Sequence, residues 1–394
     1  MGGVSMEWKE VTISDIANLK NGKKRPSEPG VIPVFGGNGI MDYVNSFNGE
    51  DTIVIGRVGA YCGCVYLSKG KCWVSDNAIA AKAKEDNDNE YLYYLLSSLN
   101  LNYHHIGGAQ PLMTQDIIGR IEVIVPQTKD DQRRIASILS SLDRKIELNN
   151  KINADLEEMA QAIFKNWFVD FEPFKDGKFV DSELGMIPEG WKVSQIADIP
   201  HILETGKRPK GGAVEKGIPS VGAEHVKGMC AYDYSKTKYI NCEFAAKLKT
   251  GKINGYELMI YKDGGKPGYF IPNFSIFGEG YPFENCYLNE HVFKLDFDGN
   301  KEFNIFCYFF FKTEQIMSYF NAQGAKAAIP GINKKDVENI YIFSPDNESV
   351  IKFGEFAYPL FKQMLKNAIE NRTLSLLRDT LLPRLMSGEL EVPE

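Results

Sequence analysis

The chain has 394 residues, of which 43% are hydrophobic and 25% charged, and its formal net charge is -7. This length suits two or three globular domains, and no apolar run reaches the roughly 18 residues of a membrane span. The seven cysteines lack the spacing of a disulfide framework or a zinc site, so we expect reduced thiols, no bound metal and a cytoplasmic location. The acidic total argues against a simple nucleic-acid coat protein.

The first segment, residues 1–127, has the pattern of an α+β head with many loops. Runs rich in β-branched and apolar residues predict strands at 31–35, 52–58, 72–82 and 121–125. The aromatic and aliphatic face of residues 89–100 predicts a helix. Glycines punctuate the strands, so this head is expected to present loops rather than a smooth surface.

Residues 128–171 form the longest helical pattern of the chain. One seven-residue ladder contains Ile135, Leu142, Leu156 and Ile163, and a second, three residues later, contains Ile138, Ile152 and Met159. No proline or glycine interrupts residues 131–171, so we predict one helix of ~40 residues, roughly 60 Å long. A rod of that length cannot be buried against one small domain.

A second helix, residues 347–390, repeats this ladder 218 positions later, at Phe353, Leu360, Asn367, Leu374 and Leu381. Asn149 occupies the matching rung of the first helix. A stripe of this kind in one helix alone also suits an ordinary core-facing helix. Because a buried Asn fixes the register of paired helices, the shared position predicts that Asn149 and Asn367 face each other in a paired coil.

A turn-rich connector, residues 172–190, leads to a second head, residues 191–346, whose opening repeats the first. WKEVTISDI at Trp8 returns as WKVSQIADI at Trp191, and Arg25-Pro26 returns as Arg208-Pro209. Self-similarity over such a period indicates a duplicated unit. The sequence therefore predicts an α+β protein with two globular heads, separated by a long antiparallel two-helix coiled coil and related by a pseudo-two-fold internal repeat.

Motifs for catalysis are not found. There is no Pro-Pro pair and so no adenine-methylation motif, and no Walker lysine motif for ATP. The GGNG at residues 36–39 is a glycine turn. We therefore expect no catalytic residue and no cofactor site in this chain.

Three pairs of loops remain as candidates for DNA contact. Basic turns carry Lys23, Lys24 and Arg25 in the first head and Lys207, Arg208 and Lys210 in the second. These side chains could contact phosphate, and arginine could read guanine; the alternative is a solvated turn. Residues 205–252 contain ten Lys and Arg against four acids, an excess that suits one solvated face and a footprint for nucleic acid equally well.

The other two loop pairs also contain polar or basic residues that could contact DNA. Gln110 lies in the loop 107–113, and Lys326 in the corresponding loop 324–329. Arg57 follows a predicted strand in the first head, as Lys262 and Lys266 do in the second. Glycines beside them permit close approach of the backbone to a ligand.

Three stretches resemble the type I restriction-modification specificity subunits. Residues 131–135 (DQRRI) resemble the start of that family's central conserved region, and residues 160–173 (AQAIFKNWFVDFEP) resemble its end. Residues 377–390 (LRDTLLPRLMSGEL) resemble its C-terminal signature. One departure is that residues 348–352 (ESVIK) lack the acidic-Gln-basic start found at Asp131.

The resemblance implies a non-catalytic subunit with two target-recognition domains, each reading one half of a split double-stranded DNA sequence. The coil would set the gap and dock two methyltransferase subunits, which supply S-adenosylmethionine. Motor-nuclease subunits, with their Mg²⁺ and ATP, would join that complex. Open alternatives are a methylation-only complex, a coiled-coil protein-interaction scaffold, and an enzyme fused in one chain, which the missing motifs oppose.

Overall fold

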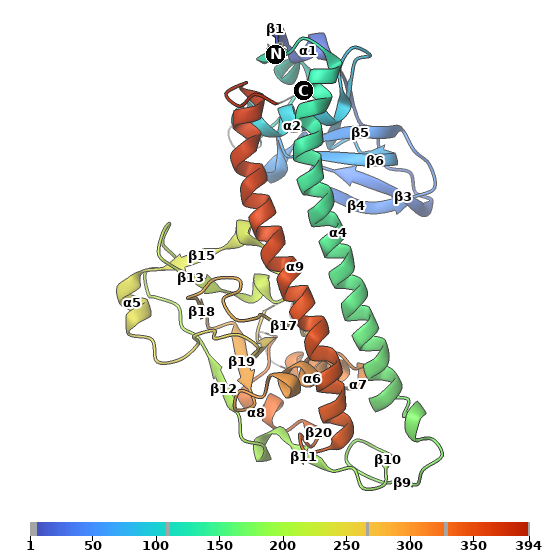
Figure 1. Cartoon of the computed structure of the whole chain (residues 1–394), viewed down its shortest axis with the longest axis vertical. Helices are drawn as coiled ribbons and strands as arrows, with labels where there is room; N and C mark the ends of the chain where they lie inside the picture. The colour runs from blue at the N-terminus through green and yellow to red at the C-terminus, as the bar shows by residue number, and fades with distance from the viewer. Residues whose placement is uncertain (1–5, 108–110, 265–267, 327–329, 393–394) are drawn as a thin grey trace, which may run out of the picture. The chain divides into compact units, whose positions relative to one another are not determined.

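The computed structural model describes residues 6–392 except 108–110, 265–267 and 327–329 (Figure 1). The chain divides into two compact units. Unit 1 contains residues 1–146 and 373–394, and unit 2 contains residues 147–372. The divide falls within both long helices, so each head is compact together with its own share of both.

Unit 1 is built on a six-stranded sheet of order β2-β7-β5-β6-β3-β4. Its strands are β2 (Ala17–Asn21), β3 (Pro29–Gly36), β4 (Gly39–Val44), β5 (Gly49–Gly56), β6 (Val65–Val74) and β7 (Ala78–Ala83). Neighbouring strands are antiparallel except β3 and β6. The prediction of one strand over 72–82 was wrong, because Ser75–Asn77 make a turn between β6 and β7.

The remaining elements of unit 1 frame this sheet. They are β1 (Trp8–Thr12), α1 (Ile13–Ile16), 3-10 helix η1 (Gly59–Tyr61), α2 (Asn89–Ser98), 3-10 helix η2 (Leu101–Tyr103), α3 (Gln115–Gly119) and β8 (Glu122–Pro126). β1 pairs antiparallel with β8, which joins the start of the head to its end. The core of the unit unites Ile53 of β5, Leu96 of α2 and Leu385 of the last helix.

Unit 2 divides the corresponding strands between a five-stranded sheet, β12-β19-β16-β17-β14, and a three-stranded sheet, β15-β13-β18. The strands are β12 (Ile202–Thr205), β13 (Ile218–Val221), β14 (Gly228–Met229), β15 (Lys238–Ile240), β16 (Leu258–Tyr261), β17 (Phe274–Ile276), β18 (Tyr287–Leu288) and β19 (Val292–Asp296). The antiparallel run β12-β19-β16-β17 matches β2-β7-β5-β6 of unit 1. The duplication inferred from the sequence is thus a duplication of topology.

The other elements of unit 2 complete the head. The strands are β9 (Phe179–Val180), β10 (Ile187–Pro188), β11 (Val193–Gln195) and β20 (Tyr341–Phe343). The helices are α5 (Cys242–Ala246), α6 (Lys301–Phe311), α7 (Glu314–Gly324), α8 (Lys334–Glu338) and the 3-10 helices η3 (Glu172–Phe174), η4 (Ile196–Asp198), η5 (Ala223–His225) and η6 (Tyr234–Lys236). β11 pairs antiparallel with β20, as β1 pairs with β8.

The two long helices are α4 (Lys129–Phe168) and α9 (Glu348–Met386), slightly shorter than the predicted 128–171 and 347–390. α4 begins with a cap, since the amide of Asp131 donates to Thr128 Oγ1 over 3.2 Å. The next residue, Gln132, is fully buried and accepts from the amide of Asp88 over 2.8 Å. These contacts give the DQRR stretch a structural role, tying the helix start to the N-terminus of α2.

α4 and α9 run antiparallel in each unit, which confirms the prediction (Figure 1). In unit 1, Arg378 Nη1 contacts Asp143 Oδ1 at 2.8 Å. In unit 2, Asn153 lies opposite Asn367, and Phe164 and Phe353 meet with ring centroids 5.2 Å apart. The residue number on α9 falls as that on α4 rises.

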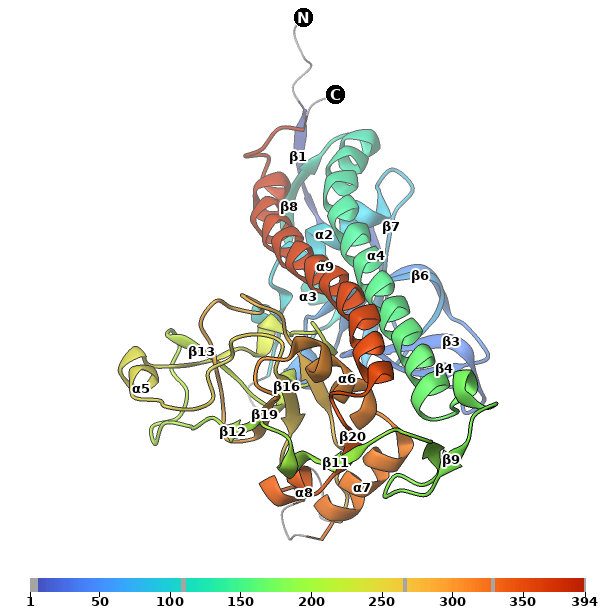
Figure 2. The same cartoon turned by 60° about the horizontal axis from the view of Figure 1, so that its bottom comes forward.

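Aromatic rings fix the far ends of the two helices within unit 2. Phe164 and Phe168 of α4 pack on Phe306 of α6 and on Phe353 of α9. The backbone of these three helices is drawn in Figure 2. One expectation for the ladder was wrong, because the side chain of Met159 is 46% exposed while neighbouring Ala160 is buried. A straight helix drifts by ~20° per heptad relative to a seven-residue repeat. The buried face of α4 therefore turns gradually away from the positions of that repeat.

Candidate nucleic-acid interface

In unit 1, the turn Ser75–Asn77 lies at the centre of the three loops that the sequence singled out. The amide of Lys23 donates to Val74 O over 3.0 Å. The amide of Arg57 donates to Asn77 O, also over 3.0 Å. The third loop joins through Met113, whose amide donates to Arg57 O over 2.8 Å.

Unit 2 repeats this arrangement around the turn Asn289–His291, between β18 and β19. The amide of Gly206 donates to Asn289 O over 3.2 Å, and that of Lys262 donates to His291 O over 2.9 Å. The amide of Ile332, which follows the predicted loop 324–329, donates to Lys262 O over 2.8 Å. In each head, therefore, the basic turn hydrogen-bonds at or beside the central turn, and Arg57 or Lys262 bonds to the last residue of that turn. The remaining segment bonds in turn to the carbonyl oxygen of Arg57 or Lys262.

In each head, a glycine allows the basic turn to lie close to the central turn. A Cβ atom on Gly22 would clash with the carbonyl oxygen of Ser75, and one on Gly206 would clash with that of Leu288. Because backbone atoms cannot move aside, the basic turn can lie against the central turn only if glycine precedes it.

The side chains of unit 1 are arranged as follows. Arg25 pairs with Asp42 of β4, and both side chains are nearly half exposed. Arg57 Nη1 donates to the carbonyl oxygen of Asp76 over 3.3 Å, while its Nε is buried without a partner. Lys23 and Lys24 are exposed.

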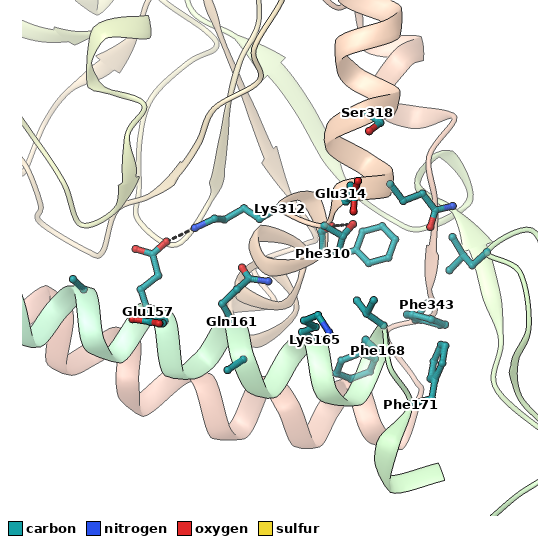
Figure 3. A pocket seen from close by; sticks show the side chains of 17 residues that line it. Glu157, Gln161, Lys165, Phe168, Phe171, Phe310, Lys312, Glu314, Ser318 and Phe343 are labelled. Atoms are coloured by element: carbon teal, nitrogen blue, oxygen red, sulfur yellow. Dashed lines mark hydrogen bonds and ion pairs between the residues drawn. The ribbon is translucent and has the colours of Figure 1, made fainter. Parts of the chain in front are cut away.

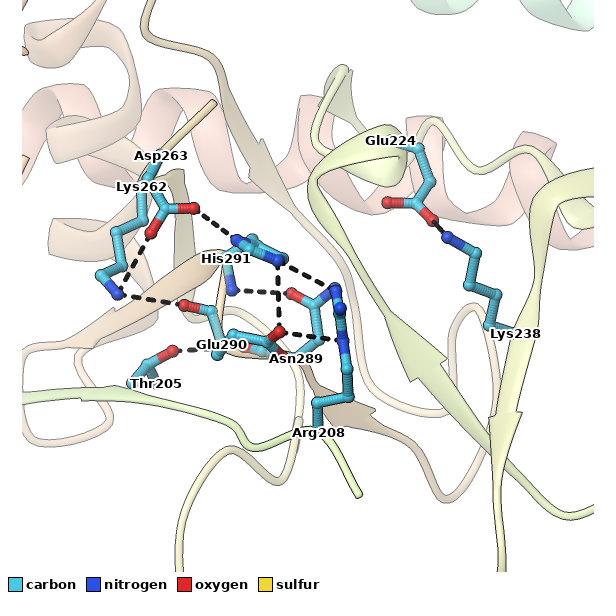
Figure 4. A network of polar contacts seen from close by, with 9 residues as sticks. All are labelled: Thr205, Arg208, Glu224, Lys238, Lys262, Asp263, Asn289, Glu290 and His291. Carbon is cyan, nitrogen blue, oxygen red and sulfur yellow. Dashed lines mark hydrogen bonds and ion pairs between the residues drawn. The ribbon is translucent and has the colours of Figure 1, made fainter. Parts of the chain in front are cut away.

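In unit 2, acidic side chains and an imidazole surround the predicted basic residues Arg208 and Lys262 (Figure 4). Arg208 Nε lies 2.9 Å from Glu290 Oε1, and Arg208 Nη2 lies 3.0 Å from His291 Nε2. Lys262 Nζ donates to the carbonyl oxygen of Glu290 over 3.2 Å and lies 3.3 Å from Asp263 Oδ2. The structure thus brings Arg208 and Lys262 into one network.

The other predicted residues lie apart from that network or outside the described chain. Lys207 and Lys210 are exposed, and exposed Lys326 donates to Gln323 Oε1 over 2.7 Å. Gln110 and Lys266 lie outside the described residues.

The central turns themselves were missed by the sequence reasoning, although a signal was present. VSDN at residues 74–77 and LNEH at residues 288–291 stand 214 positions apart, each after a β-rich run. The sequence reasoning also missed Asp42, Asp263 and Glu290 as partners of the basic side chains. Their pairings join distant stretches of chain that no local pattern links.

An exposed aromatic residue follows Arg57 in the first head and Lys262 in the second. Tyr61 of η1 is 47% exposed and Tyr269 is 56% exposed. Tyr269 and Ile271 line a hollow of about 610 Å³ together with Glu224, which pairs with Lys238 at 3.1 Å (Figure 4). Basic side chains and exposed aromatic rings in these loops suit contact with nucleic acid, including apolar contact with thymine methyl groups.

A large cavity lies elsewhere, between the C-terminal part of α4 and the junction of α6 and α7 (Figure 3). It measures about 970 Å³ and is lined by Phe168, Phe310 and Phe343. At its edge Glu157 pairs with Lys312 at 2.6 Å and accepts a hydrogen bond from Tyr308. Burial, followed by the nearby carboxylate, raises the pKa of Tyr308 far above its ordinary value, so this hydroxyl stays protonated as a structural donor.

Comparison with known proteins decides the family. The chain is 32% identical over 317 residues to the type I restriction enzyme MjaIX specificity subunit of Methanocaldococcus jannaschii, covering 78% of this chain and 70% of that protein. The chain belongs to the type I restriction-modification specificity subunits. The resemblance seen in the sequence is therefore confirmed.

Two further findings agree with membership of this specificity-subunit family. Residues 6–158 match the type I restriction modification DNA specificity domain, and the HindI specificity subunit of Haemophilus influenzae is 27% identical, over 76% of this chain and 77% of its own length. The fold is similar to that of the type I S subunit from M. genitalium, with a TM-score of 0.58 and 17% identity, covering 97% and 96% of the two chains.

Neither a metal centre nor a membrane-spanning helix is found within the described ranges. No three His, Cys, Asp or Glu side chains there come together in a way that could hold a metal ion. No helix in the described part of this specificity subunit is long and apolar enough to cross a membrane.

Proposed function

We propose that each head of this specificity subunit reads one half of a bipartite double-stranded DNA target through the three loops around its central turn. The observation that carries the proposal is the repetition of one backbone arrangement in both units. On that shared frame the side chains differ: Arg57 in one head corresponds to Lys262 in the other. The two half-sites should therefore differ in sequence.

The chemistry is assigned to partners. Methyl transfer with S-adenosylmethionine would come from two methyltransferase subunits, and ATP- and Mg²⁺-dependent cleavage from motor-nuclease subunits. The absence of nucleotide and methylation motifs in the sequence supports this division. The net charge of -7 also favours partners that contribute many of the phosphate contacts.

The helix pair is proposed to set the gap between the half-sites and to dock the methyltransferases. Exposed apolar residues recur at matching positions of the two helices, 218 residues apart. Met159 of α4 is 46% exposed and Leu377 of α9 is 45% exposed. Equivalent apolar positions on two related helices suit two copies of one partner.

Mapping methylated adenines tests the proposal. The chain is expressed with its methyltransferase in cells that lack other adenine methylation, and the genome is sequenced for modified bases. We expect one motif with two fixed halves and a gap of constant length, and no methylation when the chain is omitted. Methylation of a contiguous motif, or the same pattern without the chain, would refute the proposal and leave the scaffold interpretation. Restriction of unmethylated phage DNA then separates a complete system from a methylation-only complex.

A further inference from the structure

We propose that Arg208 is the residue with which the second head reads a guanine, and that Glu290 and His291 are the positioning residues that hold it. This inference rests on the proposed function of the heads. It goes beyond that function by naming a base, a reading residue and the two side chains on which the reading depends.

The geometry leaves one edge of the Arg208 guanidinium available. Glu290 Oε1 accepts from Nε at 2.9 Å and His291 Nε2 lies 3.0 Å from Nη2. A guanidinium has five N–H groups in a rigid fork, so the donors of Nη1 and the second donor of Nη2 stay unused by these two contacts. That pair of nitrogens has the spacing for O6 and N7 of guanine, which is the commonest specific contact in the major groove. The side chain is 56% exposed, so a base can reach it.

His291 accepts from Arg208 only in one state of its ring. Its Nδ1 is hydrogen-bonded to Asp263 Oδ1, and a carboxylate can only accept, so Nδ1 carries the proton. In the neutral ring, Nε2 is then the acceptor that Arg208 needs. Glu290 Oε1 lies 3.2 Å from the same Nε2, so the arginine satisfies two neighbouring acceptors at once.

The charged groups that face the His291 ring are Arg208, Glu290 and Asp263, and Lys262 lies on the far side of Asp263.

The two positioning residues stand on a fixed backbone. Asn289 Oδ1 accepts from the amide of His291 over 2.9 Å. The carbonyl oxygen of Asn289 accepts from Thr205 Oγ1 over 3.2 Å, and that of Glu290 accepts from Lys262 Nζ over 3.2 Å. A side chain held in its binding conformation before DNA arrives loses less entropy on binding.

The first head provides a matched control. Arg25 occupies the repeat-equivalent position, 183 residues earlier. It pairs instead with Asp42 of β4, and the central turn of that head, Ser75–Asn77, contains no histidine. The network around Arg208 is thus particular to the second head.

The test uses the assembled complex with its methyltransferase and a set of oligonucleotides in which each base pair of the target is changed in turn. With Arg208→Lys, which keeps the charge and loses the fork, we expect a roughly 5- to 150-fold loss of preference for guanine at one position of one half-site. The other half-site should keep its preferences. Arg25→Lys should leave the affected guanine position unchanged.

The positioning role is tested separately. Glu290→Ala should lower the same guanine preference, and Glu290→Gln, whose amide oxygen still accepts, should restore most of it. His291→Ala, which removes the acceptor beside Arg208 Nη2, should lower the same guanine preference as well. A complex with Arg208→Lys that assembles and retains every base preference would overturn the inference alone. Failure of the wild-type complex to show a bipartite target would instead overturn the proposed function.

Discussion

The side-chain amide of Asn149 on α4 donates to the side-chain oxygen Oδ1 of Asn371 on α9 over 2.9 Å. The same relation recurs in reverse, since Asn367 on α9 donates to Asn153 on α4 over 2.8 Å. Asn149 and Asn367 are 218 residues apart, as are Asn153 and Asn371, so the two hydrogen bonds are equivalent under the internal repeat. Asn149 and Asn367 therefore do not bond each other directly. Each bonds an asparagine that lies one helical turn from the other on the opposite helix. This stagger lets every donor meet an acceptor at the crossing.

Breaking this ladder should cost stability. Asn149→Leu removes the donor to Asn371 and to Glu370 from a fully buried position, and we expect a loss of about 1–3 kcal/mol in the free energy of unfolding. The double variant Asn149→Leu with Asn371→Leu should lose less than the sum of the two single changes. Denaturant unfolding measures all three, with exposed Lys151→Ala as control. Strictly additive losses would show that the two side chains are not coupled.

Lengthening both helices should lengthen the gap in the DNA target. A duplicated heptad, residues 145–151 in α4 and 363–369 in α9, adds about 10 Å to each helix, which corresponds to about three base pairs at ~3.4 Å per step. Methylated-base mapping should find both halves unchanged and the gap longer.

Insertion into α4 alone is the control for the heptad experiment. It shifts the ladder of one helix only, so the asparagines lose their partners and assembly should fail. An unchanged gap after the paired insertion would show that the helices do not set the spacing.

The sequence was sufficient for the helix pair because its signal is long and repeated. Asn149 and Asn367 stand out from apolar ladders, and the duplication identifies the partner helix without any knowledge of contacts. The same repeat located the loops that meet in each head. Local patterns were sufficient to predict a structure where all the residues that determine it lie within one element.

Long-range pairings were not predictable in this way. The run 72–82 was interpreted as one strand because apolar residues flank Ser75–Asn77 on both sides, although Ser, Asp and Asn together favour a turn. The contact of Arg208 with Glu290 joins residues 82 positions apart through a turn whose place depends on the pairing of β12 with β19. Such contacts follow from tertiary packing and have no local signature.

The start of α4 should give the specificity subunit an acid-sensitive contribution to stability. The hydrogen bond from Thr128, and then the Arg134 guanidinium, hold the pKa of Asp131 below its ordinary value of 3.8, against the opposing effect of burial. A carboxyl with a lowered folded-state pKa stabilises the fold above its unfolded pKa and stops doing so as the pH falls through the folded value.

Melting curves test this contribution of Asp131. The melting temperature of wild type should exceed that of Asp131→Asn at pH 7, and the difference should shrink as the pH falls below about 3.8. Asp130→Asn is the matched control, because Asp130 is exposed and should give a small difference at every pH. A difference that stays constant down to the acid limit would show that the charge of Asp131 does not stabilise the helix start.

The two matched apolar positions should act as separate docking points. Met159→Glu places a charge on the exposed face of α4, and Leu377→Glu does the same on α9, where both side chains are about half exposed. A charge in the centre of an apolar interface costs binding because it is desolvated without a partner. Each single variant should therefore bind one methyltransferase subunit instead of two, and the double variant none, as measured by mass in solution. The exposed neighbour Glu158→Gln, which changes charge beside the same site, should leave the stoichiometry at two. Loss of both subunits from either single variant would mean that the two positions belong to one shared interface.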